Sequence, residues 1–283
     1  MTIDLKWLQA QFPEISRLSP LSQGGQKEVF SGNHPTDGSV VIKLYHPKTD
    51  VDRIVREIQA VQAVGSPRVP KIFEVDIKKS PVGDLIWLRE ERIAGYSLRQ
   101  VVQQKGSFDL LQVLLLGKQM LEALVDAEKV RIVHRDVKPE NIIVDGSGNA
   151  WLLDFGLARH LDLESLTATS DYPGACTPGY APPEQFKNRK SEIDSRADLF
   201  ALGVTLYECL EGINPFTDKA RDYIEILSRV ETRPLPKISK TVDKKGKFSD
   251  LVWTMTRQRP DHRLPSVVEA LTWIQEICTE EGV

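Results

Sequence analysis

A short segment, residues 134–155, carries side chains whose types could perform group transfer. Asp136 and Asp154 are carboxylates, Asn141 offers an amide oxygen, and Lys138 is a cation two positions after Asp136. Carboxylate and amide oxygens are hard ligands of the kind that Mg²⁺ prefers. A carboxylate can also accept a hydroxyl proton, and a lysine can neutralise an anionic group. Phosphoryl transfer requires this combination of proton acceptor, cation and metal ligands.

Three motifs resemble those of protein kinases. Residues 134–141 read His-Arg-Asp-Val-Lys-Pro-Glu-Asn, similar to the catalytic loop of that family, and residues 154–156 read Asp-Phe-Gly at the family's usual distance. Residues 177–184 read Thr-Pro-Gly-Tyr-Ala-Pro-Pro-Glu and resemble the end of an activation loop, with Pro182 where the family usually has alanine. The resemblance covers nearly the whole chain. It points to the eukaryotic-like (Hanks-type) serine/threonine protein kinases, and among them to stand-alone bacterial members.

This resemblance implies a role for each polar residue of the catalytic segment. Asp136 would orient the substrate hydroxyl and accept its proton, while Lys138 would steady the transferred phosphate. Asn141 and Asp154 would hold Mg²⁺, or Mn²⁺ in its place, and the phosphates of ATP would complete the coordination. These four residues form the expected catalytic and metal-binding set.

The nucleotide site is expected to include Lys43, which lies on a predicted strand and would hold the α- and β-phosphates of ATP. An amine held in a strand needs a counter-charge to fix its rotamer, and Glu57 on the next predicted helix is the best candidate. Glu57 lies closer to Lys43 in the sequence than is typical. A plain surface charge on the helix is therefore the alternative for Glu57.

The glycine-rich loop of kinases is only partly present. Residues 22–29 read Ser-Gln-Gly-Gly-Gln-Lys-Glu-Val, so that serine and lysine replace the outer glycines. Gly24, Gly25 and Val29 would still line the nucleotide. Because glycine lets a backbone approach phosphates closely, the substitutions predict a modest affinity for ATP.

The hinge of the family aligns with the residues around Glu91 and Ile93, whose backbone would bind the adenine. This alignment puts Glu90 at the gatekeeper place, where a carboxylate is unusual. The alternation of residues 86–90 places Glu90 on the inward face of a strand. Because an unpaired buried carboxylate is costly, we expect Glu90 to contact Lys43 or a water, in competition with the helix carboxylate.

The substrate is expected to be a serine or threonine of a protein, including the chain itself. Lys138 and Thr177 resemble the serine/threonine kinases rather than the tyrosine kinases, and the platform at residues 177–184 is generally absent from small-molecule kinases such as the aminoglycoside phosphotransferases. Two alternatives remain open. The eroded glycine loop favours a pseudokinase scaffold or a partner-dependent kinase, and the platform opposes a small-molecule kinase.

Other residues match structural positions of the family. Asp198 matches the buried helix aspartate that braces the catalytic loop, and Arg263 matches the arginine that pairs with Glu184. His134 is expected to be a packed residue that supports the loop rather than a catalytic group. These four residues would therefore act on the site by holding its backbone.

Control by phosphorylation is expected in the activation loop, with Thr167, Thr169 and Ser170 as the foremost candidates. Arg135, beside the catalytic aspartate, would bind the added phosphate. Regulation by a homodimer or by a separate regulatory chain is the other expectation. The sequence identifies neither the substrate protein nor the activating signal.

The elements that must position these residues change character near residue 93. Residues 20–93 show strand patterns around one helix, whereas residues 97–280 are mostly helical. An α+β fold of two lobes is predicted, with a small β-rich lobe at residues 1–93, a helical lobe at residues 94–283 and the ATP site between them. Residues 1–17 are taken as an N-terminal extension of the first lobe.

Individual elements follow from periodicity and turn residues. The predicted strands are residues 40–44 and 85–91, a helix runs over residues 51–64 with Thr49 at its start, a hairpin spans residues 141–153, and further helices begin at Ser107 and cover residues 197–210. The lysine- and proline-rich stretch at residues 233–247 is interpreted as a solvated loop.

The composition excludes several classes of function. A formal net charge of −3 and a pI near 6.0 give no broad basic field, so neither nucleic acid nor a membrane is an expected partner. Three scattered cysteines fit neither a disulfide framework nor a metal site and indicate a reducing cytoplasm. Residues 1–12 lack the apolar centre of a signal peptide, and no stretch reaches the roughly 20 apolar residues of a membrane span. A cytoplasmic enzyme is expected.

Overall fold

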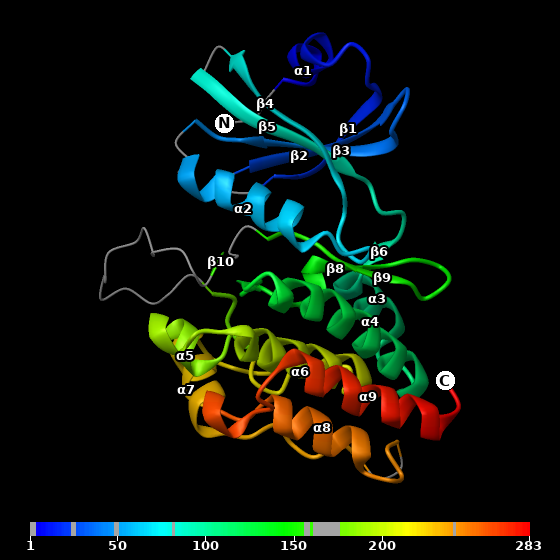
Figure 1. Cartoon of the computed structure of the whole chain (residues 1–283), viewed down its shortest axis with the longest axis vertical. Helices are drawn as coiled ribbons and strands as arrows, with labels where there is room; N and C mark the ends of the chain where they lie inside the picture. Colours follow the sequence, from blue (N-terminus) through cyan, green and yellow to red (C-terminus); the bar gives the residue numbers. More distant parts are fainter. Residues whose placement is uncertain are drawn as a thin grey trace. The chain divides into compact units, whose positions relative to one another are not determined.

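The fold is that of a computed structural model, and the structure describes residues 4–23, 27–47, 51–80, 83–155, 159–160, 176–239 and 242–283 (Figure 1). The chain divides into two compact units. The first runs up to Gly65 and continues from Pro70 to Ile93, and the second takes in Ser66–Val69 and Ala94–Val283. The first unit is built on a sheet and the second is mainly helical, which confirms the predicted α+β class.

A five-stranded antiparallel sheet forms the body of the first unit. Its strands lie in the order β1-β2-β3-β5-β4. Their bounds are Ser16–Gln23 for β1, Lys27–His34 for β2, Gly38–Tyr45 for β3, Ile72–Ser80 for β4 and Gly83–Glu91 for β5. The predicted strands at residues 40–44 and 85–91 are thus confirmed, since they lie within β3 and β5.

One face of this sheet is covered by the N-terminal helix α1 (Leu5–Gln11) and the residues that follow it. Leu8, Phe12 and Ile15 are fully buried against β3 and β5, and the ring of Phe12 meets that of Trp87 edge to face with centroids 4.7 Å apart. The segment predicted as an extension therefore belongs to the core of the first unit. Figure 1 shows α1 against the sheet.

Replacing Phe12 by alanine is expected to destabilise the first unit by about 3–5 kcal/mol, because it removes a fully buried ring and leaves a cavity. Denaturant unfolding followed by tryptophan fluorescence would report the loss, since Trp87 packs against this ring. The matched control is Leu5→Ala on the exposed side of the same helix, for which a change below about 0.5 kcal/mol is expected. Equal effects of the two changes would contradict this packing.

The opposite face of the sheet packs against helix α2 (Val51–Val64), which confirms the predicted helix; Thr49 lies outside the described residues. Ile54 and Ile58 are buried with Tyr45 of β3 and Leu88 of β5. Because side chains alternate along a strand, odd-numbered residues of β3 and even-numbered residues of β5 share this face.

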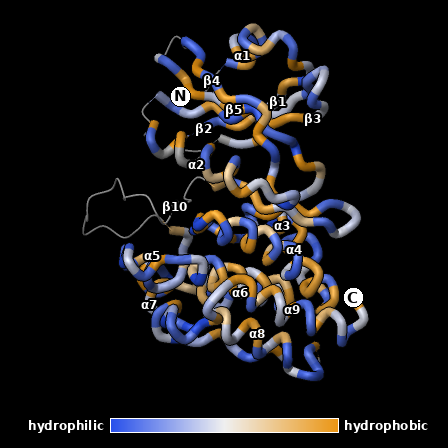
Figure 2. Tube along the Cα trace, in the orientation of Figure 1, coloured by the Kyte–Doolittle hydropathy of each residue, from blue (hydrophilic) through white to orange (hydrophobic). Residues whose placement is uncertain are grey.

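The second unit contains seven α-helices and three 3₁₀ helices within its described residues. The α-helices are α3 (Leu98–Lys105), α4 (Leu110–Lys129), α5 (Pro183–Phe186), α6 (Ser195–Glu211), α7 (Tyr223–Thr232), α8 (Lys247–Met255) and α9 (Val267–Glu281). The 3₁₀ helices are η1 (Pro139–Asn141), η2 (Lys190–Glu192) and η3 (Pro260–His262). Every residue from Ala197 to Leu210 of α6 is buried, and apolar residues concentrate along α4 and α6 (Figure 2). Helix α6 is therefore the centre of this unit.

Short strands accompany these helices. Strand β6 (Tyr96–Ser97) pairs with β8 (Ile142–Val144), which pairs with β9 (Ala150–Leu152), and β7 (Ile132–Val133) pairs with β10 (Arg159–His160). The β8–β9 pair confirms the predicted hairpin. Within the described part of the chain, no helix is both long and apolar enough for a membrane crossing.

Two predictions about the second unit are wrong in part. Helix α4 begins after Asp109 rather than Ser107, because Asp109 and Gln112 form reciprocal side-chain to backbone hydrogen bonds at 2.8 and 3.3 Å. The described residues of the stretch 233–247 are non-helical up to the start of α8, as predicted, yet they are not all solvated. Leu235 and Ile238 are buried and anchor it to the unit.

Candidate active site

The backbone of residues 134–135 is held by the central helix of the second unit. The N–H groups of His134 and Arg135 each donate to one carboxylate oxygen of Asp198 on α6, both at 2.8 Å. Burial raises the pKa of Asp198, while the charges nearby and the two N–H donors act in the opposite direction. The loop thus begins on a rigid support.

Arg135 itself adopts a left-handed backbone conformation, with φ of 68°. Residues other than glycine reach this region at a cost of order 1–3 kcal/mol, so the surrounding contacts must impose it. Besides the bond from its N–H to Asp198, its carbonyl accepts a hydrogen bond from Gln185 Nε2 at 2.7 Å. These two contacts fix the peptide groups on both sides of the strained residue.

Replacing Asp198 by asparagine is expected to destabilise the second unit by about 1–3 kcal/mol, because an NH₂ group would then face one of the two backbone N–H donors. Chemical unfolding of the purified variant would measure this loss. Asp250→Asn, which makes the same chemical change at an exposed position of α8, should cost less than about 1 kcal/mol. A neutral Asp198→Asn would contradict the bracing role.

His134 is fully buried, and its ring forms hydrogen bonds to the backbone of Asp136 and of Leu153. Its Nδ1 accepts from the N–H of Asp136 at 3.2 Å, so the ring proton lies on Nε2, which donates to the carbonyl of Leu153 at 2.9 Å. The ring also packs edge to face on Phe155, with centroids 4.5 Å apart. These contacts confirm the expectation of a packed histidine, and they tie both neighbours of Asp154 to the loop.

Three side chains converge on the carboxylate of Asp136. Lys138 Nζ lies 2.9 Å from Oδ1 and 2.7 Å from Oδ2. Thr177 Oγ1 donates to Oδ1 at 2.6 Å and accepts from Lys138 Nζ at 2.7 Å. Asn141 Nδ2 donates to Oδ2 at 2.9 Å and to the carbonyl of Asp136 at 2.8 Å. The structure therefore brings together four of the predicted site residues, including Thr177 from the platform.

The Asp136 carboxylate lies among one cation and two hydrogen-bond donors. Asp136 faces the ammonium of Lys138, and both side chains are less than one fifth exposed, so that water screens the pair only in part. The hydroxyl of Thr177 and the amide of Asn141 donate to the same group. Asp136 is thus an oriented acceptor.

The amide of Asn141 is oriented in a way that suits a metal ligand. Because its Nδ2 donates twice to Asp136, the Oδ1 points elsewhere, and no residue in the described part of the chain is recorded as donating to it. Asp154 is held between Leu153 and Phe155, with φ of 61°. The described residues contain no cluster of three or more acidic, histidine or cysteine side chains that could cage a metal by themselves. A carboxylate, an amide oxygen and ligand oxygens together fit a hard divalent cation.

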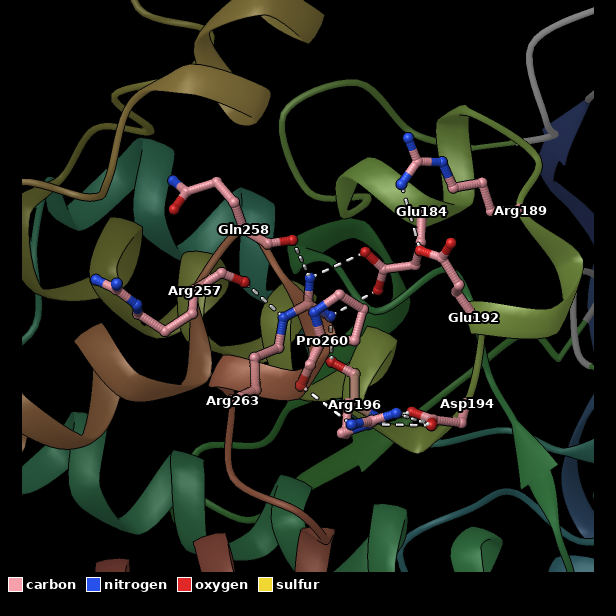
Figure 3. Close-up of polar contacts among 9 residues, drawn as sticks. All are labelled: Glu184, Arg189, Glu192, Asp194, Arg196, Arg257, Gln258, Pro260 and Arg263. Atoms are coloured by element: carbon pink, nitrogen blue, oxygen red, sulfur yellow. Dashed lines mark hydrogen bonds and ion pairs between the residues drawn. The ribbon is translucent and has the colours of Figure 1, made fainter.

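A buried ion pair joins the end of the platform to the loop after η3 (Figure 3). Arg263 and Glu184 form two parallel hydrogen bonds of 2.6 and 2.9 Å, and both side chains are almost completely buried. The remaining donors of the guanidinium bind the carbonyls of Arg257 at 2.6 Å, Arg196 at 3.0 Å and Gln258 at 3.0 Å. All five N–H groups of Arg263 are therefore used, and the pair has the partners that the resemblance implied.

In the first unit, three of the expected nucleotide-binding residues lie on strands: Val29 on β2, Lys43 on β3 and Glu91 on β5. Val29 is the cross-strand partner of Lys43, which places both on one face of the sheet. Lys43 Nζ lies 2.9 Å from Oε1 of Glu90, so the predicted contact between these residues is confirmed. Glu91 ends β5, and Ile93 ends the first unit.

Several predicted residues cannot be placed in this way. Glu57 belongs to α2, but its side chain lies outside the described residues. The same holds for the whole of Gly24, Gly25, Thr167, Thr169 and Ser170. Their expected roles remain predictions.

One polar network was not predicted from the sequence. Arg99 of α3 binds Glu140 Oε1 at 2.6 Å and Glu208 Oε1 at 2.5 Å, and it also contacts the hydroxyl of Tyr180, which donates to Glu208. Burial raises the pKa of Tyr180 above its ordinary value, so the phenol stays neutral. The network links α3, the catalytic loop, the platform and α6. Its members are up to 109 residues apart, and no local sequence signal connects them.

A cavity of about 640 Å³ in the second unit is not the catalytic centre. Glu184 contributes to its wall, but Asp136 and its three partners do not. Charged residues on its walls already pair with one another, as Lys187 does with Glu231 and Arg259 with Asp261. The cluster around Asp136 therefore lies outside the lining of this cavity.

Comparison with known proteins agrees with the motifs. The model of the protein kinase domain matches residues 15–276. Over 90% of the present chain, the sequence is 31% identical to the probable serine/threonine-protein kinase PkwA of Thermomonospora curvata. Over 89% of the present chain, it is 31% identical to the serine/threonine-protein kinase pkn3 of Myxococcus xanthus. It is also 31% identical to the serine/threonine-protein kinase PknD of Mycobacterium tuberculosis over 80%.

These relatives are longer proteins. The chain spans 33% of PkwA, 44% of pkn3 and 34% of PknD. The family match nevertheless extends over all but the ends of the chain, and it includes the residues that converge on Asp136. The sheet-rich first unit and the helical second unit agree with the two-lobed fold of this family. The chain therefore belongs to the eukaryotic-like serine/threonine-protein kinase family.

Proposed function

We propose that the chain transfers the γ-phosphate of ATP to serine and threonine hydroxyls of proteins, including its own. The observation that carries this proposal is the convergence of Lys138, Asn141 and Thr177 on the carboxylate of Asp136. This arrangement offers one oriented proton acceptor beside one cation, which is what transfer of an anionic group to a hydroxyl requires.

Each side chain has a separate task in this proposal. Asp136 binds the substrate hydroxyl and accepts its proton, and Lys138 neutralises charge on the transferred phosphate. Thr177 fixes the position of the Asp136 carboxylate relative to the Lys138 ammonium, because its hydroxyl donates to the carboxylate and accepts from the ammonium. Positioning of this kind reduces the entropy that the reacting groups must lose.

ATP and a divalent cation are the cofactors that the family uses, and we propose Mg²⁺ as the cation. Asn141 and Asp154 would hold it, because both present oxygen ligands and Asn141 is already oriented by Asp136. When bound, the cation neutralises phosphate charge and aligns the transferred group. Lys43, on the sheet of the first unit, would bind the α- and β-phosphates, and the backbone at Glu91 and Ile93 would bind the adenine.

The substrate and its location complete the proposal. Lys138 and the platform that begins at Thr177 favour a protein acceptor, and the requirement for ATP favours the cytoplasm as the place of action. The hydroxyl of the substrate protein would approach the carboxylate of Asp136. Control through the activation loop, through a homodimer or through a separate regulatory chain belongs to this proposal as well.

The test is transfer of labelled γ-phosphate from ATP with Mg²⁺ to the chain itself and to a generic basic protein. Label on serine and threonine is expected, and Lys43→Met should abolish it because the ammonium that binds the phosphates is lost. Wild-type protein that binds ATP in a titration yet labels no protein would contradict the proposal. Label on tyrosine alone would contradict the assigned acceptor class.

A further inference from the structure

Lys43 and Glu90 are diagonal neighbours on one face of the sheet in the first unit. In the antiparallel register of β3 and β5, Val41 lies opposite Glu90 and Lys43 lies opposite Leu88. Residues two positions apart on a strand point to the same side. The side chains of Lys43 and Glu90 therefore meet directly, with Nζ and Oε1 2.9 Å apart.

The surroundings of this ion pair are largely closed to water. Each of the two side chains is only 10% exposed. On the same face of the sheet, Tyr45 and Leu88 are buried against Ile54 and Ile58 of α2. A buried pair of charges is costly to break, because the group that remains is left in a medium that solvates it poorly. Separating Lys43 from Glu90 would therefore cost free energy.

The two partners are carried by the same rigid element. Strands β3 and β5 are hydrogen-bonded neighbours in the centre of the sheet, and their other face is fixed by Phe12 and Ile15. The distance between Lys43 and Glu90 thus depends on strand register, which is set by the backbone ladder. Helix α2, which carries Glu57, takes no part in this backbone ladder.

We infer that Glu90 is a positioning residue that holds Lys43 ready for the nucleotide phosphates, independently of helix α2. The inference rests on the proposed function, because it assigns Lys43 to the phosphates. A lysine ammonium has three donors, so a bond to Glu90 is compatible with bonds to phosphate oxygens.

The first test measures stability and does not depend on catalysis. Lys43→Met should lower the unfolding midpoint of the chain, because the buried Glu90 loses the ammonium beside it. The double change Lys43→Met with Glu90→Met should recover part of the loss. Simple additivity of the two single changes would overturn the inference, since coupled groups deviate from additivity.

The second test measures nucleotide affinity by titration with ATP and Mg²⁺. Glu90→Gln should weaken binding about tenfold, since it keeps the shape and removes the charge, and Glu90→Asp should restore part of the affinity. In a Lys43→Met background, Glu90→Gln should have no further effect, because Glu90 acts through Lys43. A purely structural role would instead weaken binding in both backgrounds and would overturn the inference.

The control for both tests is Glu74→Gln. Glu74 lies on β4 and pairs with Arg89 at 3.1 Å on the other face of the same sheet, so this change removes an ion pair without touching Lys43. Nucleotide affinity should stay within about twofold of wild type.

If Glu90→Gln also leaves affinity unchanged, the inference fails while labelled phosphate transfer still supports the proposed function. If coupling to Lys43 is found but no phosphate is transferred, the proposed function fails instead.

Discussion

Replacing Asp136 by asparagine should lower kcat for phosphate transfer by about 10² to 10⁴, with little change in the affinity for ATP. Asparagine keeps the size of the side chain but cannot accept a proton from the substrate hydroxyl. It also replaces one acceptor oxygen by an NH₂ group, which would face Thr177 and Lys138 or the NH₂ group of Asn141. Steady-state kinetics at saturating ATP would measure the loss, and a nucleotide titration would show that binding persists.

The matched control is Asp126→Asn on α4, whose carboxylate pairs with the exposed Lys129 at 2.9 Å. The same chemical change there should leave kcat within about twofold, since exposed pairs of this kind contribute little. If Asp136→Asn kept more than about a tenth of the wild-type rate, the carboxylate would not be the proton acceptor. Loss of ATP binding in the variant would point to a folding defect rather than to lost chemistry.

Replacing Arg263 by methionine should destabilise the second unit by about 3–5 kcal/mol. The change removes five donors at once and leaves the carboxylate of Glu184 almost completely buried without its cation. A desolvated charge without a partner costs far more than the pair contributes when intact. Thermal and denaturant unfolding of the second unit would both record the loss.

Two further variants make this prediction specific. Arg259→Met, on the same loop, breaks an exposed pair with Asp261 and should change stability by less than about 1 kcal/mol. The double change Arg263→Met with Glu184→Met should be milder than Arg263→Met alone, because two apolar side chains can replace a buried pair without leaving a charge. A double variant as unstable as the sum of both single changes would contradict this account.

The local parts of the site could be predicted from the sequence. Asp136, Lys138 and Asn141 lie within six positions of one another, so that a short motif fixes their relative placement. The contact between Lys43 and Glu90 followed from strand alternation and from the cost of an unpaired buried carboxylate. In each of these predictions, local geometry decides which atoms meet.

The parts that could not be predicted depend on distant segments or on small energy differences. Arg99 and Glu208 meet only because α3 and α6 pack together, and nothing in their own surroundings indicates it. Ser107 and Asp109 are both good helix caps, and the reciprocal bond to Gln112 selects the second. Helix α1 was missed because seven residues are too few for a clear period.

The position of α1 has a consequence for the surface that the first unit offers to other molecules. The family match begins at residue 15, whereas Leu8 and Phe12 cover Trp87 and Leu85 from outside that match. A chain cut at residue 15 would expose this apolar face, and exposed faces of that kind promote self-association. In the intact chain α1 covers this apolar face, so another molecule could bind the face only after α1 had been displaced.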